Sequence, residues 1–298
     1  MNYLVTGGSG FIGGHLVDEL LRIEPGCTIK VVDNRSSGQQ FYEVQDKRVT
    51  YYNVDICDFD KLVSLFKDVD CVFHFAAEAR IGPCIENPVM ACMTNVIGTC
   101  NVLQCSRLAN VKRVVYSSTS ACYGLKNPIP MHEDLPLDNL NPYSTSKLAG
   151  EDLAKMYHTL YGLETVSLRY FNVFGERMPE QGQYAPVVAI FLRQIRDGEP
   201  LTIVGDGLQE RDFVYVKDVV SANILASKTE SKNCGETFNV GSGNNISVLK
   251  IAKLLDHKYK HLPPRDGEAK TTLADITKIT ERLGWHPTVT LEEWITND

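Results

Sequence analysis

Residues 1–14, MNYLVTGGSGFIGG, decide the fold of this chain. A short apolar run at 3–6 leads directly into glycines, and an amphipathic pattern with helical spacing begins at residue 11. Gly7 follows the expected strand, while Gly8, Gly10 and Gly13 satisfy the G-x-G-x-x-G spacing between a strand and a helix. Glycines in this context permit a tight turn and let the backbone approach a pyrophosphate, and the helix N-terminus supplies N–H donors. The stretch therefore predicts a dinucleotide-binding α/β fold.

The rest of the first half alternates apolar runs with amphipathic ones. Runs typical of strands buried on both faces lie at 3–6, 28–33, 49–54, 71–76, 113–118 and 165–170. Helical patterns lie at 11–23, 58–66, 88–108 and 142–161. This alternation predicts a Rossmann-type doubly wound parallel sheet in a domain covering 1–170.

The rhythm breaks at 175–186, GERMPEQGQYAP. Shorter strands around Thr202 and Phe213 and further helices follow, with a last helix starting near Thr290. We expect 171–298 to form mainly a smaller α/β substrate-binding lobe, with some later segments returning to the first domain.

Composition narrows the class of partner. The 298 residues are 43% hydrophobic and 22% charged, which is ordinary globular usage, and the net charge of −7 argues against a nucleic-acid or anionic-membrane partner. The nine cysteines are odd in number and show no C-x-x-C or metal-ligand spacing, so we expect mostly buried thiols in a reducing compartment and no metal. The N-terminus lacks a signal-peptide pattern and no uncharged stretch reaches membrane-spanning length, so the expected location is the cytoplasm.

Asp33 lies twenty residues after Gly13, at the end of the second expected strand. An acidic residue there accepts hydrogen bonds from the adenosine ribose 2′-OH and repels a 2′-phosphate. Arg35 follows two residues later and could accommodate that phosphate. Asp33 favours NAD over NADP as the cofactor.

Tyr143 and Lys147 lie four residues apart at the start of the helix expected after the fifth strand. Their side chains emerge from one helix face, where an ammonium and an oxidised nicotinamide would both favour the phenolate. Tyr143 is therefore a candidate acid/base. The hydroxyls at 117–120 end the fifth strand and could pass a sugar hydroxyl proton to the tyrosine.

Three arginines are candidates for binding a diphosphate, because the planar guanidinium pairs bidentately with phosphate oxygens. Arg211 and Arg265 lie in expected loops of the second half. Arg169 lies in an apolar strand, where a buried structural ion pair is the alternative.

With these residues the chain resembles the extended short-chain dehydrogenases/reductases that act on nucleotide sugars, most closely the UDP-glucose 4-epimerase-like group. The resemblance covers nearly the whole chain. It rests on TGGSGFIG (6–13), VVDN (31–34), VDICD (54–58), HFAA (74–77), TNVIGT (94–99), SSTSACYG (117–124), PYSTSK (142–147), LRYFNVFG (168–175) and RDFVYVKDV (211–219).

The resemblance implies site residues one by one. Contacts with NAD, which stays bound through turnover in such epimerases, are implied for Gly7, Gly10, Phe11, Ile12, Asp33, Asn34, Asp55, Ile56, Ala76, Ala77, Tyr143, Lys147 and Tyr170. Thr119, Tyr143 and Lys147 match the catalytic positions. Substrate contacts are implied for Thr119, Tyr143, Asn172, Arg211, Arg265, Glu268 and the gate position Thr272, whereas Gln183 replaces an asparagine common in the group.

The resemblance also excludes related reactions. The 4,6-dehydratases carry Thr-Asp-Glu where this chain has Thr119, Ser120 and Ala121, and the UDP-glucuronate decarboxylases carry Glu at the position of Ala121. Cys122 lies one position away from the cysteine of a 3,5-epimerase and is expected to be a packed thiol. The implied reaction is 4-epimerisation of a UDP-hexose, glucose/galactose or the N-acetylhexosamine pair, through a transient 4-keto intermediate.

Three alternatives stay open. One is UDP-glucuronate 4-epimerisation, one is net oxidation by a dehydrogenase of the same superfamily, and one is a non-catalytic dinucleotide-binding protein. The last class typically lacks the Tyr or Lys, and both are present. The resemblance further implies a homodimer formed through the helices expected at 88–108 and 142–161.

Overall fold

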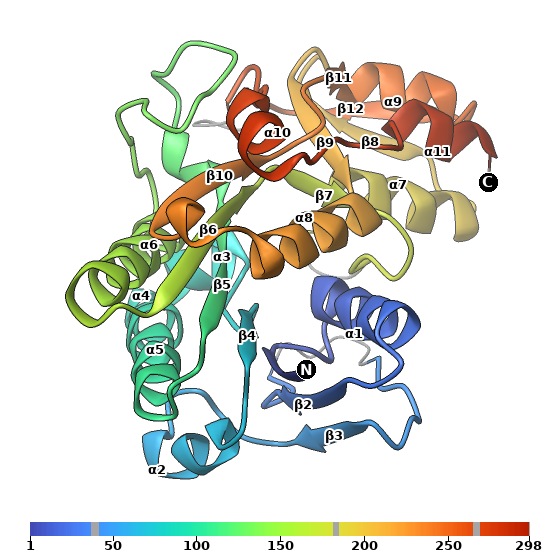
Figure 1. Cartoon of the computed structure of the whole chain (residues 1–298). Helices are drawn as coiled ribbons and strands as arrows, with labels where there is room; N and C mark the ends of the chain where they lie inside the picture. The colour runs from blue at the N-terminus through green and yellow to red at the C-terminus, as the bar shows by residue number, and fades with distance from the viewer. Residues whose placement is uncertain (37–41, 181–184, 265–268, 298) are drawn as a thin grey trace.

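The computed structural model describes residues 1–36, 42–180, 185–264 and 269–297. Its main element is a seven-stranded sheet in the order β3-β2-β1-β4-β5-β6-β10, in which all neighbouring strands are parallel (Figure 1). The strands are β1 (Asn2–Thr6), β2 (Thr28–Val32), β3 (Val49–Tyr52), β4 (Cys71–His74), β5 (Arg113–Thr119), β6 (Glu164–Tyr170) and β10 (Glu236–Val240). The predicted doubly wound parallel sheet is confirmed.

Helices cover both faces of this sheet. One face packs against α1 (Phe11–Ile23), α8 (Val216–Lys228) and α10 (Thr277–Leu283), and the other against α2 (Phe59–Val63), α5 (Thr99–Leu108) and α6 (Pro142–Tyr161). The side chains between the sheet and α1, α8 and α10 form the first core, and those between the sheet and α2, α5 and α6 form the second. Because successive strand residues point to opposite faces, Val115 of β5 lies in the first core and Val114 in the second. This two-sided burial explains why the strands read as continuous apolar runs.

The second half of the chain is divided between two places. Strands β7 (Asn172–Phe174), β9 (Glu210–Tyr215) and β11 (Asn245–Ser247) form a small sheet, and β8 (Leu201–Val204) pairs with β12 (Tyr259–Leu262). Apart from β12, whose residues are exposed, these strands pack with α7 (Val187–Arg196), α9 (Val248–Leu254) and α11 (Leu291–Asn297) around a third core. Strand β10, which the sequence analysis did not identify, instead pairs with β6 in the main sheet. The two-domain division at residue 170 stays a prediction.

Element boundaries match the predictions best where local signals are strong. Helices α1 and α6 span the predicted residues. The predicted helix at 88–108 is instead α4 (Pro88–Cys92), a π-helical turn η2 (Met93–Gly98) and α5, preceded by the unpredicted α3 (Ile81–Glu86). At the end of the π-helical turn the hydroxyl of Thr99, the first residue of α5, donates to the Asn95 carbonyl at 2.7 Å, a contact of the kind that distorts helices locally. Short 3₁₀ turns are η1 (Ser64–Phe66), η3 (Ser120–Tyr123) and η4 (Ser231–Asn233).

All nine cysteines are free. Six are buried, as expected, Cys57 and Cys100 are partly buried, and Cys92 is exposed on α4, which corrects the expectation for that residue. Within the four described ranges, no helix combines the length and apolar character needed to cross a membrane.

Candidate active site

The glycine turn joins β1 to α1 at the carboxyl edge of the main sheet. Gly7 has a φ of +69°, and a Cβ there would lie 2.7 Å from the Ala76 nitrogen. A Cβ on Gly13 would lie 2.4 Å from the Gly7 carbonyl oxygen. Gly10 is the N-cap residue of α1 and has no side chain with which to cap the helix, whose first turn contains Phe11 and Ile12. The turn therefore presents free helix N–H groups on a backbone that only glycine permits, and it fits a dinucleotide pyrophosphate.

The ends of β2 and β3 supply the acidic residues expected next to the adenosine. Asp33 accepts from the Ser9 amide through Oδ2 (3.1 Å) and from the Arg35 amide through Oδ1 (2.8 Å). Asn34 Nδ2 donates to Asp55 Oδ2 at 2.9 Å, so these two predicted residues lie together. The neighbouring Ile56 side chain is buried in the second core.

His74 connects the glycine turn to the helices behind the sheet. The Thr99 hydroxyl donates to Asn95, so it accepts from His74 Nε2–H at 2.9 Å. His74 Nδ1 then accepts from the Thr6 hydroxyl at 2.7 Å, and Thr6 in turn accepts from the Ala76 amide at 3.2 Å. Burial lowers the pKa of His74 to about 3, so the ring stays neutral. This chain of hydrogen bonds positions Ala76, next to Ala77, where the sequence places the cofactor.

Helix α6 presents the predicted catalytic pair. Asn141 and Ser144 form a capping box and Pro142 occupies the first turn, which sets the start of the helix next to Tyr143. The Tyr143 side chain lies near that of Thr119, at the end of β5, which acts to lower the pKa of the tyrosine. Lys147 lies one turn later and is 3% exposed. The structure therefore brings the three predicted catalytic residues together.

Burial dominates the ionisation of this pair. It raises the pKa of Tyr143 to about 12, although the neighbouring Thr119 side chain acts in the opposite direction. Burial also lowers the pKa of Lys147 to about 7, and the nearby Glu151 carboxylate opposes that shift. Burial thus favours the neutral form of both groups. Its effect on the pKa of Tyr143 exceeds the opposite effect, stabilisation of the phenolate by the Lys147 ammonium, that was expected from the Tyr–Lys spacing.

Tyr116 of β5 contacts both the side chain and the backbone of Lys147. Its ring centroid lies 4.5 Å from Lys147 Nζ, and its hydroxyl donates to the Lys147 carbonyl oxygen at 3.0 Å. A Cβ on Gly150 would lie 2.0 Å from the Tyr116 hydroxyl oxygen, so the glycine makes room for this contact. Tyr116 was not predicted from the sequence, because its contact with Lys147 joins positions 31 apart.

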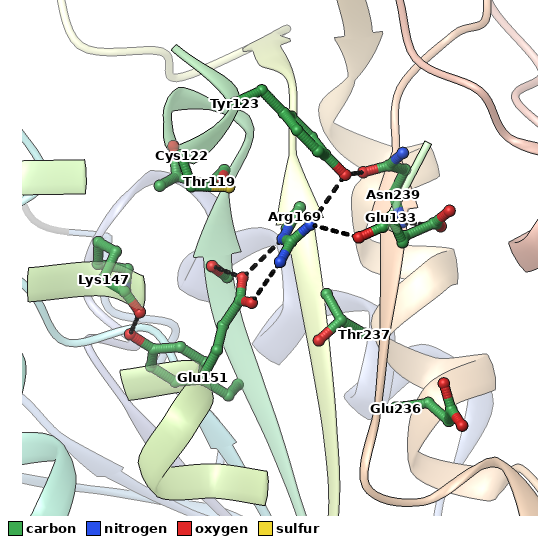
Figure 2. Close-up of polar contacts among 12 residues, drawn as sticks. Thr119, Cys122, Tyr123, Glu133, Lys147, Glu151, Arg169, Glu236, Thr237 and Asn239 are labelled. Atoms are coloured by element: carbon green, nitrogen blue, oxygen red, sulfur yellow. Dashed lines mark hydrogen bonds and ion pairs between the residues drawn. The ribbon is translucent and has the colours of Figure 1, made fainter. Parts of the chain in front are cut away.

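A buried polar network continues from the same helix (Figure 2). Arg169 makes two hydrogen bonds to Glu151, at 2.9 and 2.8 Å, and one to the Tyr123 hydroxyl at 3.0 Å. Ser118, the residue before Thr119, also donates to Glu151. The Tyr123 hydroxyl donates to Asn239 of β10 at 2.7 Å. Glu151 could have been found from the sequence, since it lies four residues after Lys147 on the same helix face.

This network decides between the two interpretations of Arg169. Its side chain is 5% exposed and that of Glu151 is 6% exposed. The guanidinium therefore forms the buried structural ion pair, and Arg169 is removed from the candidates for diphosphate binding.

The predicted substrate residues of the second half surround β9. Asn172 Nδ2 donates to the Asp212 carbonyl oxygen at 2.8 Å, the Thr272 amide donates to the Glu210 carbonyl oxygen at 3.1 Å, and Arg211 lies between these two positions of the strand. The Asp212 carboxylate, which the sequence analysis missed, accepts from the amides of Ser242 (2.6 Å), Gly243 (3.1 Å) and Ala274 (3.0 Å). Arg265, Glu268 and Gln183 lie outside the described residues.

Tyr170 uses its side chain elsewhere. Its ring belongs to the first core, and its hydroxyl donates to Asn223 of α8 at 2.9 Å. A contact with the cofactor would therefore involve the backbone of Tyr170, and this assignment stays a prediction.

Comparison with known proteins agrees with the glycine turn and the tyrosine–lysine pair. Residues 3–241 match the model of the NAD dependent epimerase/dehydratase family. The chain belongs to this family. The predicted family and the NAD cofactor are thereby confirmed, and NAD fits the glycine turn and Asp33 described above.

Individual relatives are similar over nearly their full lengths. The chain is 38% identical to a putative UDP-glucose 4-epimerase of Methanocaldococcus jannaschii, covering 98% of this chain and 95% of that protein. It is similar to the crystal structure of a Thermotoga maritima UDP-glucose 4-epimerase with UDP-glucose, with a TM-score of 0.92, 37% identity and coverage of 99% and 96%. A UDP-N-acetylglucosamine 4-epimerase from Methanobrevibacter ruminantium has a TM-score of 0.92 and 34% identity, with coverage of 99% and 95%.

Proposed function

We propose that this protein is an NAD-dependent isomerase that epimerises C4 of a UDP-hexose, either the glucose/galactose or the N-acetylhexosamine pair. The observation that carries the proposal is the contact between Tyr143 and Thr119, one helical turn from the buried Lys147, at the sheet edge that carries the glycine turn. The similarity to UDP-glucose and UDP-N-acetylglucosamine 4-epimerases supports the substrate class.

Each catalytic residue receives a separate role. NAD, when bound, supplies reversible hydride chemistry at the sugar C4. Tyr143 exchanges the proton of the C4 hydroxyl, directly or through Thr119, whose Oγ also accepts from the Ala121 amide at 3.1 Å. Lys147 supplies the positive charge that lowers the phenol pKa when its ammonium form is present.

The residues after the catalytic threonine disfavour loss of water from the sugar. Ser120 and Ala121 continue from Thr119 into the η3 turn, and neither carries the carboxyl group that a 4,6-dehydratase of this family would need there. The family name alone includes dehydratases, so this difference directs the proposal to epimerisation.

Binding of the cofactor and binding of the substrate are assigned to different parts of the chain. We assign NAD to the domain 1–170 and the UDP-sugar mainly to 171–298, with Asn172, Arg211, Arg265, Glu268 and Thr272 as substrate contacts. The hexose must present both faces of C4, so the nucleotide end should supply most of the binding energy.

Free thiols favour the cytoplasm as the location.

The test is product analysis of the purified protein without added cofactor. UDP-glucose, UDP-N-acetylglucosamine and UDP-glucuronate are incubated separately and followed by proton NMR. A C4 epimer is the expected product, and its relative rate identifies the sugar, whereas accumulation of free NADH would support a net dehydrogenase.

Tyr143→Phe should lower kcat by about 10²–10⁴-fold because the acid/base group is lost. Tyr161→Phe, at the exposed end of the same helix, is the matched control, and unchanged turnover in Tyr143→Phe would contradict the assignment.

A further inference from the structure

Arg35 is the residue beside Asp33 whose chemistry would suit NADP rather than NAD. It lies two positions after Asp33, on the surface beside the expected ribose site, with a backbone φ of +54°. An arginine in this position is the group that accommodates a 2′-phosphate in NADP-binding proteins. Whether Arg35 can do so depends on what its guanidinium already binds.

The guanidinium of Arg35 is paired with Glu43. Arg35 Nε donates to Glu43 Oε1 at 3.0 Å and Nη2 donates to the same oxygen at 2.5 Å. The Arg35 side chain is 38% exposed and the Glu43 side chain 26%, so the pair lies at the surface without being fully solvated. The pair joins the end of β2 to a segment that returns towards the glycine turn.

Glu43 is itself held at the glycine turn. Its Oε1 accepts from the Ser9 hydroxyl at 3.3 Å, and the preceding Tyr42 amide donates to the Ser9 carbonyl oxygen at 3.0 Å. The Ser9 amide meanwhile donates to Asp33. Ser9 therefore links both carboxylates, and Glu43 lies next to Asp33 at the edge of the expected ribose site.

We propose that Glu43 is a second determinant of NAD specificity, because it holds the Arg35 guanidinium away from a 2′-phosphate and adds a negative charge beside Asp33. The three side chains sum to a charge of about −1, whereas a 2′-phosphate would add about two further negative charges. Like charges brought together in this way select strongly against the wrong partner. The inference depends on the dinucleotide alone and holds whichever sugar is epimerised.

The test compares which dinucleotide each variant retains. Each protein is synthesised in a desalted cell-free system that contains equal concentrations of NAD and NADP, then purified and denatured. The released dinucleotides are measured by mass spectrometry. Wild type should hold NAD almost alone, and Glu43→Gln should raise the NADP-to-NAD ratio by about tenfold, because the charge of −1 is removed and Arg35 is released.

Three further variants separate the causes. Glu19→Gln removes a carboxylate that pairs with Arg22 on α1 and should leave the ratio unchanged. Arg35→Leu combined with Glu43→Gln should lose most of the gain, since the released guanidinium is the proposed phosphate ligand. Glu43→Ala removes the same carboxylate and serves if Glu43→Gln does not fold. A wild-type ratio in either Glu43 variant, or a double variant that keeps the whole gain, would overturn the proposal.

Discussion

Lys147 is an ionisable residue in surroundings that disfavour its charge. Its Nζ lies over the Tyr116 ring and near the Glu151 carboxylate, while burial lowers its pKa to about 7. The ammonium and amine forms are therefore both accessible near neutral pH. At the same place Tyr143 stays protonated, because burial raises its pKa to about 12.

This balance predicts a pH dependence of catalysis. Lys147 is an ammonium below its pKa and an amine above it, and only the ammonium can lower the pKa of Tyr143. We expect kcat/KM to fall as pH rises through about 7, since this parameter reports ionisations of the free enzyme. The measurement is the initial rate of epimerisation at low substrate concentration across this range. A profile that stays flat up to about pH 9 would contradict the assignment.

At the scale of elements, catalysis depends on how α6 packs on β5. At Gly150 the helix leaves no room for a side chain beside Tyr116, and one turn earlier the Lys147 carbonyl oxygen accepts from the Tyr116 hydroxyl. The same two elements also contribute Glu151 and Ser118 to the buried network around Arg169. The helix is thereby held by one steric contact and one ionic contact, both within the turn that follows Lys147.

Gly150→Ala tests the steric contact. Its Cβ would lie 2.4 Å from the Tyr116 Cζ, so the ring or the helix must shift, and overpacking of this kind typically costs about 1–3 kcal/mol. We expect a lower free energy of unfolding and a lower kcat, because Lys147 moves with the helix. Gly26→Ala is the control, since a Cβ there meets nothing within 4 Å. Equal stability of the two variants would show that the interface adapts freely.

Glu151→Gln tests the ionic contact. It leaves the buried Arg169 guanidinium without its counter-charge, which should lower the free energy of unfolding by about 3–5 kcal/mol in urea denaturation. Glu19→Gln breaks the Arg22 pair at the surface, where both side chains are more exposed and screened by solvent, and should have a much smaller effect on the free energy of unfolding. If both variants lose the same small amount, the Arg169 pair does not stabilise the fold.

At the scale of the whole molecule, one apolar surface has no partner within the described part of the chain. Ile85, Val89, Met93 and Ile97 are spaced four residues apart along α3, α4 and η2, and they are 56%, 70%, 47% and 45% exposed. Val89, Met93 and Ile97 lie on the continuous helical backbone of α4 and η2, whereas Ile85 lies on α3, beyond the non-helical Asn87. Exposed apolar side chains at this spacing favour burial against another protein surface. We propose that it contributes to a homodimer interface, as the sequence resemblance implies.

Two charges on this apolar surface should separate the subunits. Val89→Asp combined with Met93→Asp places carboxylates in the proposed interface, and we expect the mass measured by light scattering to fall from that of a dimer to that of a monomer. Tyr259→Asp, at an exposed apolar residue of β12, is the control. A wild-type protein that is already monomeric would contradict the proposal.

The sequence alone was sufficient for features that depend on neighbouring residues. The strand–glycine–helix pattern, the limits of α1 and α6, the position of Asp33 and the four-residue spacing of Tyr143 and Lys147 are local, because each follows from backbone geometry over a few residues. The resemblance extended this to Thr119, which lies against Tyr143 as expected.

Which distant residues meet follows from the three-dimensional fold. It paired Arg169 with Glu151, Arg35 with Glu43 and the Lys147 carbonyl with Tyr116, and it inserted β10 beside β6. It also determined burial, and burial rather than spacing sets the pKa values of Tyr143 and Lys147. The physical reason is that charge pairing and desolvation depend on distances through space, which a linear pattern of residues does not contain.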